Sequence, residues 1–264
     1  MLLRTSDAEL SYQTVGKGAN VVLLHPFPSN HEFWCPVQEK LSARHRLIMP
    51  DLRGLGESGC GEGPATMQKH AEDVVRLCDE LKVGKAVFVG CSIGGYILFE
   101  FWRRHRERVN ALVLANTKPS ADDAEAKATR LQAAEQVLQQ GPEAYIDGML
   151  EKLLGESTRR NRPDLVDGAR RTMARTTAQG IAAVQRGMAE RPDSLPTLAK
   201  ISVPVMILGG AEDVLVPRAE MEKMRAGIKN SSLQIVPKAG HYAVFERPAE
   251  VGIILKQFVE QTAR

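Results

Sequence analysis

Residues 87–96 decide the fold of this chain, and they read Val-Phe-Val-Gly-Cys-Ser-Ile-Gly-Gly-Tyr. An apolar strand runs into the pattern Gly-x-Ser-x-Gly, and helical spacing follows it. Gly90 and Gly94 stand where a very tight turn brings the flanking backbone together, which a side chain would obstruct. Such a turn pushes its central residue out above the sheet, where the side chain is free to react. The stretch therefore predicts a strand–turn–helix unit that presents Ser92.

Cys91, directly before Ser92, is the rival nucleophile in this stretch. Centring the turn on Cys91 would place Val89 and Ile93 at the two positions that need glycine. The glycine spacing therefore favours Ser92. A glycine-rich turn with an idle serine stays open until partners for the serine are found.

Outward from this stretch, short apolar runs alternate with segments of helical spacing. Continuous apolar runs of this length are typical of strands buried on both faces of a parallel sheet. The predicted strands are Val21–His25, Arg46–Pro50, Ala86–Gly90, Val109–Asn116, Val205–Gly210 and Leu233–Val236, with an antiparallel edge strand at Ala8–Thr14. The predicted helices between and after them are Thr66–Leu81, Ser92–His105 and Pro248–Thr262. The alternation predicts an α/β fold with a doubly wound, mostly parallel sheet.

Residues 118–199 break this alternation, since they are rich in Ala, Gln and Arg and show no convincing strand. Gly-Pro and Arg-Pro pairs divide them into several helices. We predict that 118–199 form an all-helical cap inserted into a core domain of 1–117 and 200–264; a helical hairpin on the sheet edge is the alternative. An adaptable apolar ceiling is expected from Met149, Leu150, Leu153, Leu154, Met173 and Met188. The charges of this segment nearly cancel, so nothing in it argues for a charged substrate.

Composition excludes several classes of protein. The 264 residues, 43% of them hydrophobic, can bury one sizeable core. A net charge of +3 is too small to imply a nucleic-acid partner. The N-terminus lacks a signal-peptide core, and no apolar run is long enough to span a membrane, so a cytoplasmic protein without a membrane partner is expected. Cysteines 35, 60, 78 and 91 have no metal-site spacing, and we expect no metal and no cofactor; a homo-oligomer is left open.

A serine hydroxyl needs a base within hydrogen-bond reach, and that base needs a carboxylate to orient it. In a fold with this strand–turn–helix unit, the partners follow in the order Ser, acid, His. Downstream, the predicted strand Val205–Gly210 runs into a loop that carries Glu212 and Asp213, and His241 precedes the last helix. Both loops follow strands at the carboxyl edge of the sheet, where sites of open α/β sheets assemble. His241 is thus the predicted base, and the acid lies in the Glu212–Asp213 loop.

At this point the sequence resembles the α/β-hydrolase superfamily, from about Val21 to Phe258. The family carries its acid in a G-x-x-D-x-x-x-P-like loop, which residues 210–217 match. The resemblance implies that Asp213 is the acid, with Glu212 as the runner-up. Some members place the acid after an earlier strand, but Asn116 ends that strand here and carries no charge.

Two more segments are similar to the family's patterns. Residues 240–248 match G-H-x-x-x-x-E-x-P around His241, and residues 51–58 match D-x-R-G-x-G-x-S. The second segment lacks the lysine and the spacing of a phosphate loop. We interpret it as scaffolding for turns and for the wall of the site. His25 and His31 are interpreted as structural, since His25 ends a strand and has no evident acid partner.

The resemblance also identifies the loop after the first buried strand, residues 24–30, as the family's oxyanion loop. Acyl transfer needs two N–H donors aimed at the oxygen that becomes negative. Ile93, directly after the nucleophile, would supply one backbone N–H. Phe27 would supply the other, because Pro26 and Pro28 have no N–H. Pro26 replaces the family's glycine, which leaves the loop's conformation open, including a cis proline.

The family resemblance implies a serine hydrolase. Members that hydrolyse haloalkanes or epoxides use Asp at the turn, so Ser92 argues against those reactions. The expected reaction is cleavage of small to medium carboxylic esters through an acyl-enzyme on Ser92. Enol-lactone hydrolysis, carbon–carbon bond hydrolysis and cofactor-free perhydrolysis use similar triads and stay open as alternatives, as does a non-catalytic or slow-turnover sensor of a small ligand.

Overall fold

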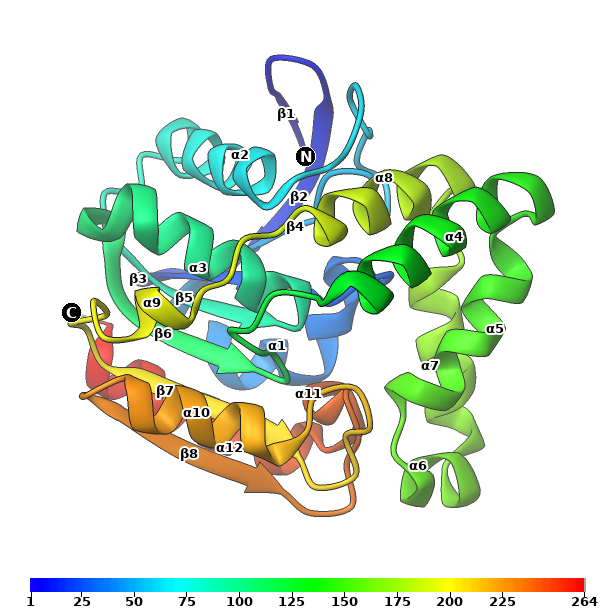
Figure 1. Cartoon of the computed structure of the whole chain (residues 1–264). Helices are drawn as coiled ribbons and strands as arrows, with labels where there is room; N and C mark the ends of the chain where they lie inside the picture. Colours follow the sequence, from blue (N-terminus) through cyan, green and yellow to red (C-terminus); the bar gives the residue numbers. More distant parts are fainter. Residues whose placement is uncertain (264) are drawn as a thin grey trace.

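The computed structural model describes residues 1–263, and within them eight strands form one sheet (Figure 1). The strand order is β1-β2-β4-β3-β5-β6-β7-β8. The strands are β1 Leu2–Arg4, β2 Glu9–Val15, β3 Ala19–Leu24, β4 His45–Pro50, β5 Ala86–Cys91, β6 Val109–Ala115, β7 Val205–Gly210 and β8 Ser231–Val236. β1 was not predicted, because three residues carry too little pattern to stand out. The other seven lie within two residues of the predicted bounds, but β2 is not the edge strand that was predicted, because β1 pairs with its outer side.

The sheet is parallel from β4 to β8, and β2 pairs antiparallel with both β1 and β4. Strand β3 shows why the pattern is apolar throughout. Val21 and Leu23 face one core cluster, whereas Val22 and Leu24 face the other, and all four are fully buried. Both faces of the strand therefore contact helices, as expected for a doubly wound sheet. The predicted fold class is confirmed.

Helices cover both faces of the sheet. Val37 and Leu41 of α1 and Val251, Leu255 and Val259 of α12 pack into one core cluster, while residues of α2, α3 and α10 pack into the other. These helices are α1 Cys35–Ser42, α2 Met67–Glu80, α3 Ile93–His105, α10 Arg218–Gly227, α11 Ala243–Glu246 and α12 Pro248–Thr262, with 3-10 turns η1 His31–Trp34 and η2 Arg106–Arg108. In residues 1–263, no helix is long and apolar enough to cross a membrane.

The chain between β6 and β7 folds into a group of helices, and all but the last of them gather to one side of the sheet (Figure 1, green to yellow-green). They are α4 Ala124–Gln140, α5 Pro142–Leu153, α6 Glu156–Asn161, α7 Pro163–Met173, α8 Ala178–Ala189 and α9 Leu195–Leu198. Pro142 and Pro163 stand in the first turns of α5 and α7, where a missing N–H costs nothing. The division of the chain into a core domain and a cap at 118–199 stays a prediction.

The topology brings two loops together at one edge of the sheet. The connection after β3 leads to β4 on one side, and the connection after β5 leads to β6 on the other side. The two connections therefore diverge between β3 and β5. A crevice at such a switch point, outside the carboxyl ends of the strands, is where open α/β sheets bind ligands. The predicted oxyanion loop follows β3 and Ser92 follows β5, so the fold places both at this crevice.

Candidate active site

Ser92 stands in the turn between β5 and α3, with φ 53° and ψ −112°. This left-handed backbone is unusual for a non-glycine residue and is typical of functional turns. Two hydrogen bonds hold the turn: the Ser92 N–H donates to the Ala115 carbonyl at 2.9 Å, and the Thr117 hydroxyl donates to the Ser92 carbonyl at 2.8 Å. The side chain is partly exposed, as the predicted turn requires.

The glycines beside Ser92 are needed because backbone and side-chain atoms of neighbouring segments approach them closely. A Cβ added to Gly90 would lie 2.5 Å from the carbonyl carbon of Gly94. A Cβ added to Gly95 would lie 2.4 Å from Cγ2 of Thr117, a constraint that the sequence did not reveal. Cys91 faces the core, and complete burial raises the pKa of its thiol. A thiolate is therefore disfavoured at Cys91.

His241 and Asp213 lie against each other at the ends of β8 and β7. His241 Nδ1 is 2.9 Å from Asp213 Oδ2 and 3.1 Å from Oδ1, and both side chains are almost inaccessible to solvent. The N–H groups of Leu215 and Val216 donate to Asp213 Oδ1 at 2.9 and 3.0 Å. Burial favours the protonated carboxyl, but the charge and hydrogen bonds of His241 and its other donors hold the pKa of Asp213 below its ordinary value. The Asp213 carboxylate is thus ready to orient the imidazole.

Glu212, the runner-up for the acid, contacts another part of the molecule. Its carboxylate accepts hydrogen bonds from the Ser157 hydroxyl, at 2.5 Å, and from the Ser157 N–H, at 2.8 Å. These bonds tie the β7 loop to α6 and hold the pKa of Glu212 below its ordinary value in spite of partial burial. The structure therefore brings Asp213, and not Glu212, to His241.

Asn116 is a residue of the site that sequence reasoning missed. It has φ 46°, and its Nδ2 donates to Asp213 Oδ2 at 2.9 Å and to the Gly240 carbonyl at 3.2 Å. From the sequence, this position stands out only because it lacks the acid that some family members carry there. The position of Asn116 at the end of β6 could have indicated this role, because β6 neighbours β7 and the carboxyl ends of the two strands meet.

The loop after β3 is held firmly at the crevice. The bond between Phe27 and Pro28 is cis, and the Ser29 N–H donates to the Pro26 carbonyl at 3.0 Å. The buried Tyr242 hydroxyl donates to the Phe27 carbonyl at 3.3 Å, and the Thr176 hydroxyl donates to the Pro28 carbonyl at 3.0 Å. The N–H groups of Phe27 and Ile93 as the oxyanion donors stay a prediction.

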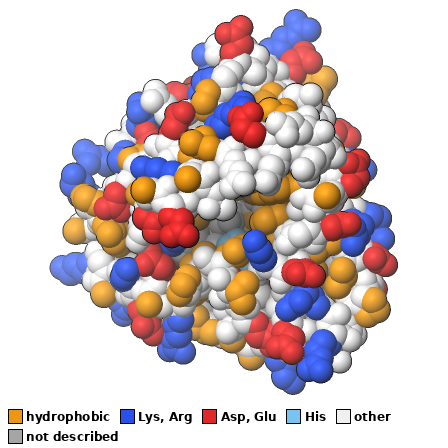
Figure 2. Space-filling model, turned by 45° about the vertical axis from the view of Figure 1, so that its right-hand side comes forward, with side chains coloured by type: hydrophobic (Ala, Val, Ile, Leu, Met, Phe, Trp, Pro, Cys, Tyr) orange, Lys and Arg blue, Asp and Glu red, His pale blue; other side chains and the backbone are white. Residues whose placement is uncertain are grey.

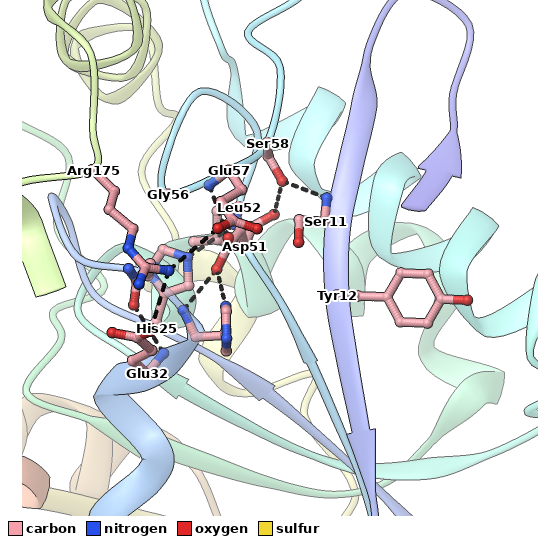
Figure 3. Close-up of polar contacts among 12 residues, drawn as sticks. Ser11, Tyr12, His25, Glu32, Asp51, Leu52, Gly56, Glu57, Ser58 and Arg175 are labelled. Atoms are coloured by element: carbon pink, nitrogen blue, oxygen red, sulfur yellow. Dashed lines mark hydrogen bonds and ion pairs between the residues drawn. The ribbon is translucent and has the colours of Figure 1, made fainter. Parts of the chain in front are cut away.

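A buried network around Asp51 supports that loop (Figure 3). Asp51 Oδ1 accepts from the His31 N–H at 2.8 Å and faces the His31 ring Nδ1 at 2.6 Å, while Oδ2 accepts from the Glu57 N–H at 2.9 Å. His25 Nε2 accepts the Leu52 N–H at 2.9 Å, and burial lowers the pKa of His25 to about 4. A neutral His25 that accepts at Nε2 carries its proton on Nδ1, 3.0 Å from the Pro26 carbonyl. The segment 51–58 and both histidines are thus structural here.

A cavity of about 550 Å³ opens above these groups and is lined by Ser92, His241 and Phe27. Figure 2 shows this side of the molecule, with side chains of both charges around a hollow. Met149, Leu153 and Met188 line the cavity, as the predicted apolar ceiling requires. The other three predicted ceiling residues, Leu150, Leu154 and Met173, are buried in the core instead.

The near-zero charge sum of residues 118–199 does not show which of their charged side chains face the cavity. Six charged residues line the cavity: Lys118, Asp122, Asp123, Glu125, Arg130 and Lys152. Summing charges over the segment could not reveal this, because the sum ignores which side chains face inward. Among residues 1–263, no group of three or more His, Cys, Asp or Glu side chains is arranged to hold a metal ion.

A serine on a strand-to-helix turn, a histidine paired with an aspartate at later strand ends, and one cavity shared by the serine and the histidine define an α/β-type serine hydrolase. The comparison with protein families agrees. The model of the alpha/beta hydrolase fold family matches residues 19–248, and the chain belongs to this family.

Relatives of this chain include esterases and an enol-lactonase. The chain is 36% identical to a thermophilic esterase from Thermogutta terrifontis, solved with malate bound, with a TM-score of 0.96 and 100% of both chains covered. It is 27% identical to 3-oxoadipate enol-lactonase 2 of Acinetobacter baylyi, over 97% of this chain and 96% of the relative. It is 29% identical to a pimeloyl-[acyl-carrier protein] methyl ester esterase of Citrobacter koseri, over 92% and 94%. The chain is therefore a hydrolase of this family.

Proposed function

We propose that this protein hydrolyses small to medium carboxylic esters through an acyl-enzyme on Ser92. The observation that carries the proposal is that Ser92 and His241 line one cavity while Asp213 holds the far side of the imidazole. The similarity to an esterase of Thermogutta terrifontis over the whole chain supports it. A cavity of about 550 Å³ is in the range that suits small and drug-sized ligands.

The chemistry follows from the imidazole. A carboxylate only accepts hydrogen bonds, so the Nδ1 that faces Asp213 carries the proton and Nε2 of the neutral ring has a free lone pair. Nε2 takes the Ser92 proton as Oγ bonds to the ester carbonyl carbon, and the N–H groups of Phe27 and Ile93 stabilise the oxyanion. His241 then gives the proton to the departing alkoxide. Water repeats the sequence on the acyl-enzyme, releasing the acid and restoring Ser92.

Enol-lactone hydrolysis is the second candidate. A lactone is a cyclic ester, so the same steps open it, and its leaving group stays attached to the acyl part. The relative from Acinetobacter baylyi, which is an enol-lactonase by name and matches 97% of this chain, favours this candidate. Carbon–carbon bond hydrolysis, perhydrolysis, a sensor role and a cytoplasmic location stay predictions.

The test is a series of p-nitrophenyl esters from acetate to hexanoate, followed by pre-steady-state nitrophenolate release. We expect turnover and a burst close to one nitrophenolate per active site, because the acyl-enzyme accumulates when deacylation is slow. Ser92→Ala should show neither. If the folded protein binds these esters without releasing nitrophenolate, the proposal is wrong and the sensor role is favoured.

A further inference from the structure

One wall of the cavity holds a buried cluster of charges that the proposed mechanism does not use. Asp122 in this cluster has a side chain that is 2% exposed. Its carboxylate accepts from Arg130 Nε at 2.5 Å and from both terminal nitrogens of Arg191, and Lys118 Nζ lies 3.5 Å away. Burial acts against this carboxylate, but the two arginines hold the pKa of Asp122 well below its ordinary value. Asp122 is therefore charged, and three cations surround it.

The three cations exceed the single carboxylate by two positive charges. The charge of Arg191 has other partners besides Asp122. Its guanidinium stacks on the Tyr96 ring at 4.3 Å and donates to the Ser120 carbonyl. Lys118 and Arg130 line the cavity with side chains that are only 24% and 22% exposed. Half-buried charges are screened much less than exposed ones. The positive charge of Lys118 and Arg130 therefore raises the electrostatic potential inside the cavity.

Other acids near the cavity do not cancel this excess. Glu220 also feels the charge of Lys118, but its carboxylate is paired more closely with Lys223 Nζ, at 2.5 Å, and accepts from the Ser120 hydroxyl. Asp123 and Glu125 are exposed at the rim, where Asp123 caps the Ala126 N–H, and the exposed Lys152 offsets part of their charge. Exposed rim charges are screened by water and salt. Inside the cavity, the half-buried Lys118 and Arg130 are therefore screened less than the acids at the rim.

A neutral donor completes this wall. Arg130 Nη1 donates to Gln185 Oε1 at 3.0 Å, and Gln185 Nε2 donates to the Tyr145 hydroxyl. Since that hydroxyl oxygen accepts from Gln185, its own proton is available to a ligand. Burial raises the pKa of Tyr145 to about 12, so the proton stays on. Within the described residues Arg130 donates through Nε and Nη1, which leaves Nη2 for a ligand.

We infer that the cavity selects esters or lactones that carry a second, free carboxylate, held by Lys118, Arg130 and the Tyr145 hydroxyl while Ser92 attacks the ester. The inference rests on the proposed function and names its substrate class. Charge-assisted hydrogen bonds to Lys and Arg are among the strongest that a carboxylate makes, and here they replace the water it loses on entry. A neutral ester would leave both cations without that partner.

The kinetic test compares mono-p-nitrophenyl glutarate with its methyl ester, which has the same chain but no charge. We expect kcat/KM to favour the anion by about tenfold or more, as one charge-assisted hydrogen bond allows. Lys118→Gln and Arg130→Gln should each lower this preference about tenfold. Lys152→Gln, which removes a rim cation from the same cavity, should keep it. Equal use of both esters, or equal preference in all three variants, would overturn the inference while leaving ester hydrolysis intact.

A binding measurement separates this inference from the proposed function. Calorimetry on Ser92→Ala with monomethyl glutarate and with dimethyl glutarate needs no turnover. We expect monomethyl glutarate to bind and dimethyl glutarate not to bind, and Lys118→Gln in the Ser92→Ala protein to weaken the binding about tenfold. This result supports a carboxylate site at Lys118 and Arg130 even if neither nitrophenyl ester is hydrolysed. Equal affinity for both compounds contradicts it. Thermal unfolding of each variant shows that it is folded, and Lys118→Gln, which removes the more distant of the cations, disturbs Asp122 least.

Discussion

Asn116 Nδ2 donates a hydrogen bond to Asp213 Oδ2 at 2.9 Å and so joins the carboxyl ends of β6 and β7. The same oxygen of Asp213 is 2.9 Å from His241 Nδ1. Position 116 thus lies one hydrogen bond from the carboxylate that orients the imidazole. A carboxylate at the end of β6 would occupy nearly the same region as the one after β7.

This proximity predicts that the acid can be moved. Asp213→Asn alone removes the carboxylate, whereas Asp213→Asn with Asn116→Asp restores one beside His241. We expect the double variant to recover kcat by about tenfold or more over the single variant, a small part of the total loss because the geometry is not ideal. Asp213→Asn with Asn116→Ala is the matched control and should recover nothing. Equal kcat in the two folded double variants would contradict the relationship.

The two acids of the β7 loop should differ sharply in their effect on rate. Asp213→Asn is expected to lower kcat by about 10⁴-fold, because the imidazole loses its orienting partner and the required tautomer. Glu212→Gln should change kcat by less than about tenfold, since its carboxylate bonds to Ser157 and not to His241. Steady-state kinetics with p-nitrophenyl butyrate measures both. The reverse ranking would assign the acid to Glu212.

The tight turn beside Ser92 makes Gly90 hard to replace. In Gly90→Ala the new Cβ would meet the Gly94 carbonyl carbon at 2.5 Å, so we expect a loss of more than about 2 kcal/mol in the free energy of unfolding. Gly148→Ala in α5 has nothing within 4 Å of the new Cβ and should gain about 0.5–1 kcal/mol. Denaturant unfolding compares them. If both variants matched the wild type, the close backbone contact would be wrong.

Buried histidines predict that stability falls in mild acid. Burial lowers the pKa of His70 to about 3, and neither ring nitrogen has a hydrogen-bond partner in residues 1–263. Below pH 6.5 the unfolded chain binds a proton at His70 that the folded protein does not. Titration of His70 therefore leaves the free energy of unfolding unchanged above pH 6.5 and lowers it as the pH falls from 6.5 toward 3.

His70→Leu removes this titration. Relative to the wild type, we expect the free energy of unfolding of His70→Leu to improve by about 2 kcal/mol between pH 7 and pH 5, from a slope of about 1.4 kcal/mol per pH unit. Denaturant melts at several pH values give the difference. Carboxylates that titrate lower contribute equally to both proteins and cancel. Parallel curves over this range would show that His70 is not buried in its neutral form.

Much of the fold could be predicted because local pattern and global topology agree. The apolar runs at β3 to β7 need no long-range information, since a strand covered on both faces is apolar at every position. The order of Ser92, Asp213 and His241 was readable for a similar reason, as each follows a strand at the same sheet edge. The turn at Ser92 was marked by Gly90, which only a close backbone contact explains.

The parts that the sequence did not predict depend on contacts between distant segments. Asn116 and Asp213 are far apart in the chain and meet only through the pairing of β6 with β7. The charged cluster around Asp122 joins Lys118 from a loop and Arg130 from α4, which line the cavity, with Arg191 from beyond α8 behind them, and no periodicity links the three. The net charge of residues 118–199 could not predict this cluster, because a sum gives buried and exposed charges the same weight.

The most direct test of the account is where a fluorophosphonate bonds to the folded protein. Only a hydroxyl activated by a neighbouring base reacts quickly with such a reagent. We expect one adduct per chain, mapped by peptide mass spectrometry to Ser92, kept in Cys91→Ala and absent in Ser92→Ala. Labelling that survives in Ser92→Ala, or that disappears in Cys91→Ala while that variant stays folded, would contradict the assignment of Ser92 as the nucleophile.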